Sequence, residues 1–277
     1  MTQKPLVLAV ETSSRIGSVV IALGENILDE ATFSAPIRHS AEIFPALSNI
    51  LDRFCRKPDQ IDQVHISVGP GSFTGLRIAV TLAKTMHLAN AAKIVAVDTL
   101  DVIAANATDY LKEENTNITS HSERSEVEDP LRRESPKRIA TILDAKRGQF
   151  FIAVYERNTN DKQRATSDGP ASGGYRSEPS VAGWKKFFPD SLMTASQFLD
   201  QFAQSEKPIW LLGDGLLYYK DKFKADGTRF LDQNYWSPRA SKVHRLAWKK
   251  ALTNQFADPL TLTPNYLLRP EIKIKPR

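Results

Sequence analysis

The sequence predicts an α/β fold in which one unit of strands and helices occurs twice. Each half of the chain opens with short apolar runs separated by turns, which is the pattern of antiparallel strands, and continues with helices and further strands. A polar stretch from Lys112 to Pro136, with only three apolar residues in 25, separates the halves. We therefore expect a first domain over residues 1–110 and a second over residues 137–277. The pattern does not predict the strand order.

In the first half, apolar runs alternate with turns, and three segments carry apolar residues at helical spacing. The predicted strands are 6–10, 18–23, 26–34, 65–68 and 94–97, and the predicted helices are 40–54, 74–90 and 98–107. The first two strands should form a hairpin around the turn Glu11–Gly17. Pro45 falls early in the first helix, where a proline is tolerated.

The second half shows fewer elements. Its predicted strands are 139–143, 149–155 and 209–212, and its predicted helices are 196–204 and 240–256. The first two strands should pair around the turn Asp144–Gly148. The last helix, 240–256, is a candidate to pack back on the first domain.

Two segments contain too few apolar residues to pack. One is the insertion 111–136 between the domains, and the other is 157–183 in the second domain, with five apolar residues in 27. Ordering a backbone costs roughly 1–2 kcal/mol per residue, and these segments bury too little surface to offset it. We expect both to be mobile surface insertions, one disordered between the domains and one within the second domain.

Composition excludes several classes of protein. The longest apolar run is six residues, Phe150–Tyr155, far short of the roughly 18 needed to span a membrane, and no signal-like leader precedes the first strand. The single cysteine, Cys55, excludes an internal disulfide framework. The net charge of +5 divides into −2 for residues 1–183 and +7 for residues 184–277. We expect a soluble cytoplasmic protein whose basic last third is either a solvated face or a surface for an acidic partner.

The strongest local motif is Gly69-Pro70-Gly71-Ser72-Phe73-Thr74-Gly75-Leu76-Arg77, between a predicted strand and helix. Glycines at such a junction allow either an anion-binding loop or a tight structural turn. Leu76 stands where a Walker motif has its lysine, so we favour the turn. Ser72 or Thr74 can cap the helix that follows.

The helix after this motif is apolar around most of its circumference, so it must be buried on more than one side, as a core helix or an interface helix. Together with the helix at 40–54 it is a plausible hydrophobic dimer surface. We expect Leu82→Asp or Ala83→Arg to abolish partner binding while the monomer stays folded.

Two turns are candidates for a nucleotide cleft between the related domains. The first hairpin turn contains Glu11 and Ser13, and a late strand ends in Gly213-Asp214-Gly215. Acids and glycines are also ordinary turn residues, so an unremarkable structural role remains open. No two of the five histidines lie at i and i+4, and no known metal or nucleophile motif is present.

Five segments together resemble the bacterial TsaB (YeaZ) family. They are LAVETSS (8–14), RHSAEIFPAL (38–47), GPGSFTGLRIA (69–79), LDAKRGQFFIAVY (143–155) and PNYLLRP (264–270). The resemblance implies two domains of the actin-like ATPase fold (actin, hexokinase, Hsp70 and ribonuclease H-like proteins). It also implies kinship with the TsaD/Kae/M22 glycoprotease-like family. Glu11 stands where many members have Asp, which keeps the acidic character.

The resemblance further implies the function. Such proteins are required, non-catalytic subunits of the tRNA N6-threonylcarbamoyladenosine pathway. Their partner, a TsaD-like subunit, transfers the threonylcarbamoyl group from threonylcarbamoyl-AMP to the adenosine 3′ of the anticodon in tRNAs reading ANN codons. A TsaE-like ATPase joins the assembly, and tRNA is bound through the complex.

The resemblance also guides the expected sites. TsaD-like enzymes hold a metal with a His-x-x-x-His pair, whereas here His39 is followed by Ile43 in the second position. We therefore expect no catalytic residue, no metal and no required cofactor. Residual ATP or ADP binding and homodimer formation stay open. The expected partner interface is formed by Ile43, Leu47, Leu51, Phe73, Thr74, Leu76, Arg77, Val80, Ala83 and Met86. The alternatives are a small-molecule phosphotransferase of the same fold and an M22-type metallopeptidase.

Overall fold

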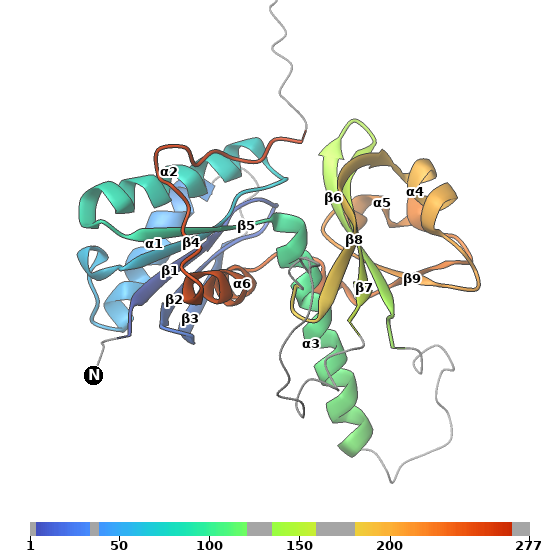
Figure 1. Ribbon diagram of the computed structural model, residues 1–277, viewed down its shortest axis with the longest axis horizontal. Helices are drawn as coiled ribbons and strands as arrows, with labels where there is room; N and C mark the ends of the chain where they lie inside the picture. Colours follow the sequence, from blue (N-terminus) through green and yellow to red (C-terminus); the bar gives the residue numbers. More distant parts are fainter. Residues whose placement is uncertain (1–3, 34–38, 121–134, 159–180, 268–277) are drawn as a thin grey trace, which may run out of the picture.

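The computed structural model describes residues 4–33, 39–120, 135–158 and 181–267. The chain forms two halves, each built on a five-stranded mixed sheet, with one long helix between them (Figure 1). No helix in these residues is long and apolar enough to cross a membrane.

The first sheet has the strand order β3-β2-β1-β4-β5. Its strands are β1 Leu6–Glu11, β2 Gly17–Leu23, β3 Asn26–Phe33, β4 Gln63–Ser67 and β5 Lys93–Val97. Strands β1, β2 and β3 pair antiparallel, whereas β1, β4 and β5 run parallel. The carboxyl ends of the three parallel strands therefore meet at one edge of the sheet.

The second sheet has the strand order β10-β9-β6-β7-β8. Its strands are β6 Arg138–Lys146, β7 Gln149–Arg157, β8 Trp184–Thr194, β9 Ile209–Leu212 and β10 Thr228–Phe230. As in the first sheet, an antiparallel meander of three strands is extended by two parallel strands beside its first strand. This repeated topology confirms the predicted α/β fold class, the actin-like and ribonuclease H-like fold.

Six α-helices cover the sheets of the described chain. They are α1 His39–Arg53, α2 Phe73–Asn90, α3 Thr99–Ser120, α4 Ala195–Phe202, α5 Leu216–Tyr219 and α6 Ala240–Leu252. Strand β1 shows how they are placed, because its side chains alternate between two cores. Leu8 and Val10 contact the core that contains α1 and α2, while Val7 and Ala9 contact the core that contains α6.

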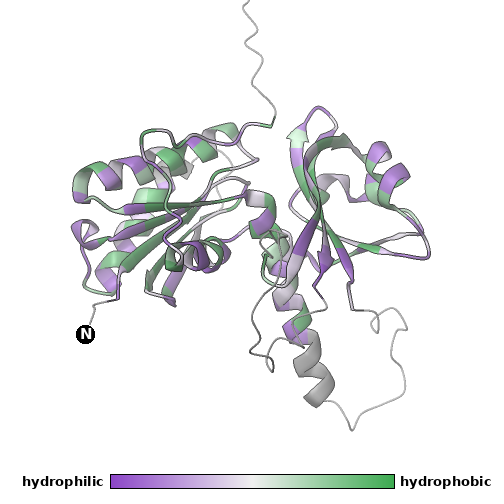
Figure 2. Cartoon of the chain, viewed as in Figure 1, coloured by the Kyte–Doolittle hydropathy of each residue, from purple (hydrophilic) through white to green (hydrophobic). Residues whose placement is uncertain are grey.

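Helix α3 joins the halves by packing in two directions. Leu100, Ile103, Ala104 and Ala107, at helical spacing, lie in the core of the second sheet, whereas Val102 and Ala105 lie in the core beneath α6. The colouring in Figure 2 shows that apolar residues concentrate on the strands inside each half, while the exposed helix faces are mixed or polar.

Helix α3 differs from the sequence prediction at its end. It continues to Ser120, although the apolar pattern predicted an end near Ala107 and a disordered insertion from residue 111. Tyr110 and Leu111 pack against the second core and extend the buried face of the helix. Residues 121–134 of that insertion, and 159–180 of the second one, lie outside the described residues.

The second half contains elements that the apolar pattern did not predict. Strand β8 pairs with β7 along 11 residues, but its register shifts twice and Pro189 interrupts its sequence, so no clean alternation is visible. The three-residue β10 and four-residue α5 are too short to give a periodic signal. Helix α6 ends at Leu252 rather than at Phe256.

Candidate functional site

The glycine-rich motif lies at the carboxyl end of β4 and packs directly on the turn that follows β1. The Ser72 amide donates to the carbonyl of Ser13 at 2.7 Å, and the Thr12 hydroxyl donates to the carbonyl of Gly75 at 2.7 Å. A Cβ atom at Gly75 would lie 1.8 Å from the Thr12 carbonyl oxygen, and one at Gly71 would lie 2.5 Å from that of Ser13. The glycines therefore serve close packing between two backbone segments. Ser72 caps α2 by accepting from the Gly75 amide.

A segment near the C-terminus completes this end of the molecule. The Asn265 amide donates to the Val68 carbonyl at 2.7 Å, next to the start of the motif. The Tyr266 ring lies 5.0 Å from the ring of Phe73, and Arg77 lies over the Phe73 ring while its Nε donates to the Tyr266 hydroxyl at 3.3 Å. Two motifs that lie 189 residues apart thus form one surface beside the start of α2. Both motifs can be recognised in the sequence, but no local pattern predicts that they are in contact.

Most residues of the predicted partner interface point into the protein. The members that lie in the core of the first half are Ile43, Leu47, Leu51, Val80 and Ala83, and Leu76 is also fully buried. Phe73 and Met86 are half-buried, and only Thr74 and Arg77 are exposed. The apolar surface of α1 and α2 that remains exposed comes from two residues outside the prediction, Phe44 (58% exposed) and Leu88 (84% exposed).

This burial corrects one expectation. Leu82 and Ala83 are 5% and 0% exposed and belong to the core of the first half, so a charge at either position would unfold that half instead of selectively blocking a partner. The partner interface itself stays a prediction, now centred on the exposed residues of the two helices.

The two halves meet where the β1–β2 turn faces the turn after β9. The Arg15 amide donates to Oδ2 of Asp214 at 3.5 Å, and the Arg15 guanidinium lies 3.6 Å from Oδ2 of Asp144. Arg15 also stacks on Tyr218, 4.3 Å from the ring centroid. The structure thus brings together the two turns predicted to form a cleft. It adds Arg15, Asp144 and Tyr218, which were not predicted as site residues because their partners across the two halves lie far away in the sequence.

The acids of this region are deeply buried. One oxygen of Glu11 accepts from both the amide and the hydroxyl of Ser13, while the other has no hydrogen-bond partner among the described residues. Burial raises the pKa of Glu11 above its ordinary value, against the lowering effect of the bonds from Ser13. Burial raises the pKa of Asp214 to about 6, against the lowering effect of Arg15. Both side chains are therefore shifted toward their neutral form.

The predicted glycines of the second turn have a packing role. Gly213 has a φ of +126°, and a Cβ there would lie 2.2 Å from the Ile142 carbonyl oxygen. Gly215 donates its amide to the same carbonyl at 3.1 Å. The turn is thereby held against β6 with Asp214 facing Arg15.

These residues do not form a ready site for a divalent cation. Within the described part of the chain, no group of three or more His, Cys, Asp or Glu is placed to hold a metal ion. Asp144 is already paired with Lys146 at 2.8 Å as well as with Arg15, so the cation that faces it comes from the chain itself. Ile43, at the position where the resemblance led us to look for a second histidine after His39, is fully buried.

Known proteins that match this chain in sequence are named for tRNA threonylcarbamoyladenosine biosynthesis or for the transferase of that name. A family model described as TsaD, tRNA N6-adenosine threonylcarbamoyltransferase, matches residues 33–170. The chain is 24% identical over 272 residues to the tRNA threonylcarbamoyladenosine biosynthesis protein TsaB of Bacillus subtilis (strain 168), covering 97% of this chain and 96% of the relative. It is 26% identical over 155 residues to the TsaB protein of Escherichia coli (strain K12), covering 56% of each.

Solved structures agree on the fold. YeaZ from Pseudomonas aeruginosa aligns with a TM-score of 0.68 at 17% sequence identity, covering 95% of this chain and 100% of that one. The similarity in sequence and in fold extends over nearly the whole chain, including the five segments that carry the resemblance. These comparisons support identifying the chain as similar to the TsaB (YeaZ) proteins of tRNA threonylcarbamoyladenosine biosynthesis.

Proposed function

We propose that this protein acts in tRNA threonylcarbamoyladenosine biosynthesis as a non-catalytic subunit that binds a TsaD-like transferase. The family relationship supports the pathway. The internal pairing of Asp144 and the isoleucine at position 43 support a role without metal catalysis. On this proposal the subunit requires no cofactor of its own and works in the cytoplasm, where a TsaE-like ATPase and tRNA join the complex.

The observation that carries the partner-binding part is the exposed apolar surface of α1 and α2. Both helices pack on the same face of the first sheet through their buried residues, yet Phe44 and Leu88 remain more than half exposed on their outer side. Large exposed apolar side chains on neighbouring helices favour a protein interface. Arg77, stacked on Phe73 beside Tyr266, provides a polar rim at one end of α2.

The experiment is co-purification of the full chain with the TsaD-like subunit. Phe44→Asp should weaken the complex at least tenfold, because it places a charge in an apolar contact. Phe187→Asp is the matched control, since Phe187 is 57% exposed on β8 in the other half. In a depleted strain, Phe44→Asp should fail to restore threonylcarbamoyladenosine in tRNA, whereas Phe187→Asp should restore it. Equal binding by both variants would place the interface elsewhere.

A second copy of this chain is the competing occupant of the same surface. Sedimentation of the purified chain distinguishes the two, because Phe44→Asp would then dissociate a homodimer in the absence of the transferase. The phosphotransferase alternative requires tight binding of ATP with Mg²⁺ that Asp214→Ala abolishes, and the paired state of Asp144 does not favour it.

A further inference from the structure

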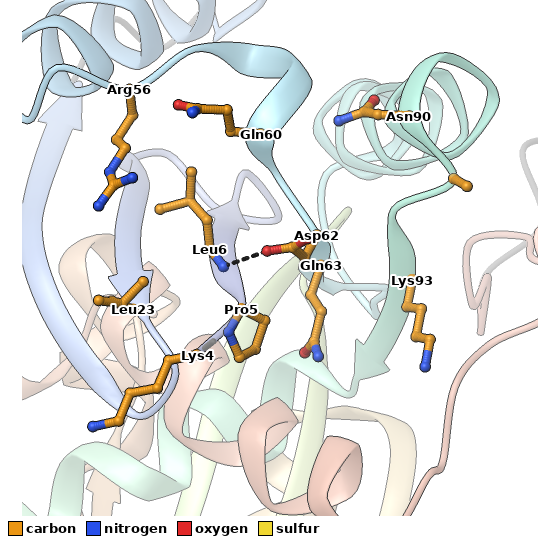
Figure 3. Close-up of a pocket in the computed structure, with 11 residues that line it drawn as sticks. Lys4, Pro5, Leu6, Leu23, Arg56, Gln60, Asp62, Gln63, Asn90 and Lys93 are labelled. Carbon is orange, nitrogen blue, oxygen red and sulfur yellow. Dashed lines mark hydrogen bonds between the residues drawn. The ribbon is translucent and has the colours of Figure 1, made fainter. Parts of the chain in front are cut away.

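A polar pocket lies at the amino ends of β1, β4 and β5, the opposite edge of the first sheet from the glycine-rich motif. Its volume is about 550 Å³, and seven of its eleven lining residues are polar or charged (Figure 3). The six residues of β1 separate it from the Glu11 turn by about 20 Å. It is therefore distinct from the Glu11 turn and the glycine-rich motif, although Asn90 at the end of α2 lines it.

The charges of this pocket are unbalanced. Lys4, Arg56 and Lys93 line it, and within the described chain none of them forms an ion pair, although Lys93 contacts the Phe256 ring at 4.7 Å. The single acid in the lining, Asp62, accepts the Leu6 amide at 2.7 Å, the bond drawn in Figure 3. Three cations and a single carboxylate, itself already engaged, thus line the pocket.

Two of the three neutral polar residues of the pocket add hydrogen-bond donors, whereas Asn90 already donates its –NH2 group to the carbonyls of Pro58 and Ile61. The side-chain oxygen of Gln60 accepts from the Lys57 amide at 2.9 Å, and that of Gln63 lies 3.1 Å from Nε2 of His65. With both oxygens engaged, the –NH2 groups are the ends that remain for a ligand. Three cations and two amide donors fit a ligand rich in negatively charged oxygens, and the polar lining does not fit an apolar molecule.

The second half repeats this feature at equivalent strands. A pocket of about 280 Å³ lies at the amino ends of β6 and β9, which correspond to β1 and β4 in the shared strand order. Its lining includes Lys137, Arg138 and Lys207 against one acid, Glu206. Both pockets, at the amino ends of the central strands, are therefore lined by more cations than acids, although residues 1–183 as a whole have a net charge of −2.

We propose that the pocket formed by Lys4, Arg56 and Lys93 binds phosphate groups of an RNA backbone. This inference rests on the proposed function, which gives tRNA as the substrate of the complex. A phosphodiester chain presents charged oxygens to separated cations, and such contacts position an RNA without reading its sequence. The location at the carboxyl end of α2 leaves Phe44, near the amino end of α1, accessible to a protein partner.

The test compares two variants of equal charge in a binding titration with an unmodified tRNA transcript, using the full chain alone and with the TsaD-like subunit. The pocket variant is Lys4→Gln/Arg56→Gln/Lys93→Gln. The control is Lys185→Gln/Lys222→Gln/Lys249→Gln, three exposed lysines of the basic last third. The pocket variant should bind at least tenfold more weakly, and its salt dependence should fall by about 0.9 in log–log slope per lost phosphate contact, while the control stays within about twofold.

Two results would overturn the proposal. One is an equal loss in both variants, or a larger loss in the control, which would place tRNA on the last third of the chain. The other is tight binding of free AMP at the pocket with tRNA affinity unchanged in the pocket variant, which would make the ligand a nucleotide. Co-purification of the pocket variant with the TsaD-like subunit is measured alongside. If the pocket variant keeps its affinity for tRNA, the RNA-binding proposal is wrong while the proposed function stands. If the wild-type chain does not bind the TsaD-like subunit, the proposed function itself is wrong.

Discussion

The two halves share one strand order but differ in what connects the parallel strands. In the first half, the 18-residue helix α2 follows β4, and α1 packs beside it on the same core. In the second half, the equivalent connection after β9 is the four-residue α5. Each half also has a helix before this connection, α1 or the eight-residue α4, so the difference is the length of the connection itself, whose turn in the second half faces the first half through Asp214.

The same backbone rule operates at both junctions. After β4, Gly75 packs on the carbonyl of Thr12 just beyond β1, and after β9, Gly213 packs on the carbonyl of Ile142 in β6. Because β1 and β6 are equivalent strands, each half places a glycine where its connection touches its central strand. Both halves therefore have a glycine at this contact, while the side chains around it differ.

The largest loss of stability should come from a charge on the buried face of α2, the long helix that only the first half has. Leu82→Asp places a carboxylate in the first core, where Leu82 is 5% exposed, and should lower the free energy of unfolding by about 4–5 kcal/mol. Thr81 is exposed and directly precedes Leu82 in the same helix, so Thr81→Asp should change the free energy of unfolding by less than about 1 kcal/mol. Urea unfolding of both variants measures the difference. Similar stabilities would show that α2 is not a core helix.

The sequence predicted the parts of this comparison that depend on local periodicity. The hairpin β1–β2, the helix α2 and the strand β9 follow from runs of apolar residues with a repeat of two or of 3.6. Strand β8 was missed because its bulged register and Pro189 break the alternation. The extension of α3 was missed because polar residues follow Leu111.

The candidate site was predictable only in part. Glu11, Asp214 and the glycines stand in turns between predicted strands and helices, so their types and positions marked them. The contacts that join the halves do not appear in any local pattern, since Arg15 meets an acid 199 residues away and Arg77 meets a tyrosine 189 residues away. Burial was misjudged for the same reason, because an apolar helix surface does not reveal which of its sides the rest of the chain covers.

The next largest loss of stability should come from replacing the glycine that packs at each junction. Gly75→Ala should destabilise the protein by about 3 kcal/mol or more, since its Cβ would overlap the Thr12 carbonyl. Gly213→Ala should cost a similar amount, because it adds a left-handed φ to a 2.2 Å contact. Gly148→Ala is the control: its φ is +75° but nothing lies within 4 Å of a Cβ, so about 1 kcal/mol is expected. Guanidinium unfolding of the three variants ranks them, and a mild effect at only one junction would end the claim that both halves follow one rule.

The smallest change in stability should come from Asp214, a carboxyl at the second junction. Because burial raises the pKa of Asp214 from 3.8 to about 6, the folded protein holds this proton up to about pH 6 while the unfolded chain releases it near pH 4. The wild type therefore loses stability through this group as the pH rises from about 4 to 6. Asp214→Asn keeps the shape of the side chain without the charge, so it should be more stable than the wild type by about 1–3 kcal/mol at pH 7.5, with the gain disappearing near pH 4.

Urea midpoints of both proteins at pH 4, 5, 6 and 7.5 measure this gain.

The buried pair His65 and His244 changes stability in the opposite direction. Burial lowers the pKa of His65 to about 3 and also lowers that of His244, so both take up protons less readily in the folded protein than in the unfolded chain, which does so below about pH 6.5. Both proteins carry this pair, so its contribution cancels in their difference. A gain that is constant from pH 4 to 7.5 would show that Asp214 is ionised throughout, and that Arg15 pairs with it as strongly as burial opposes its charge.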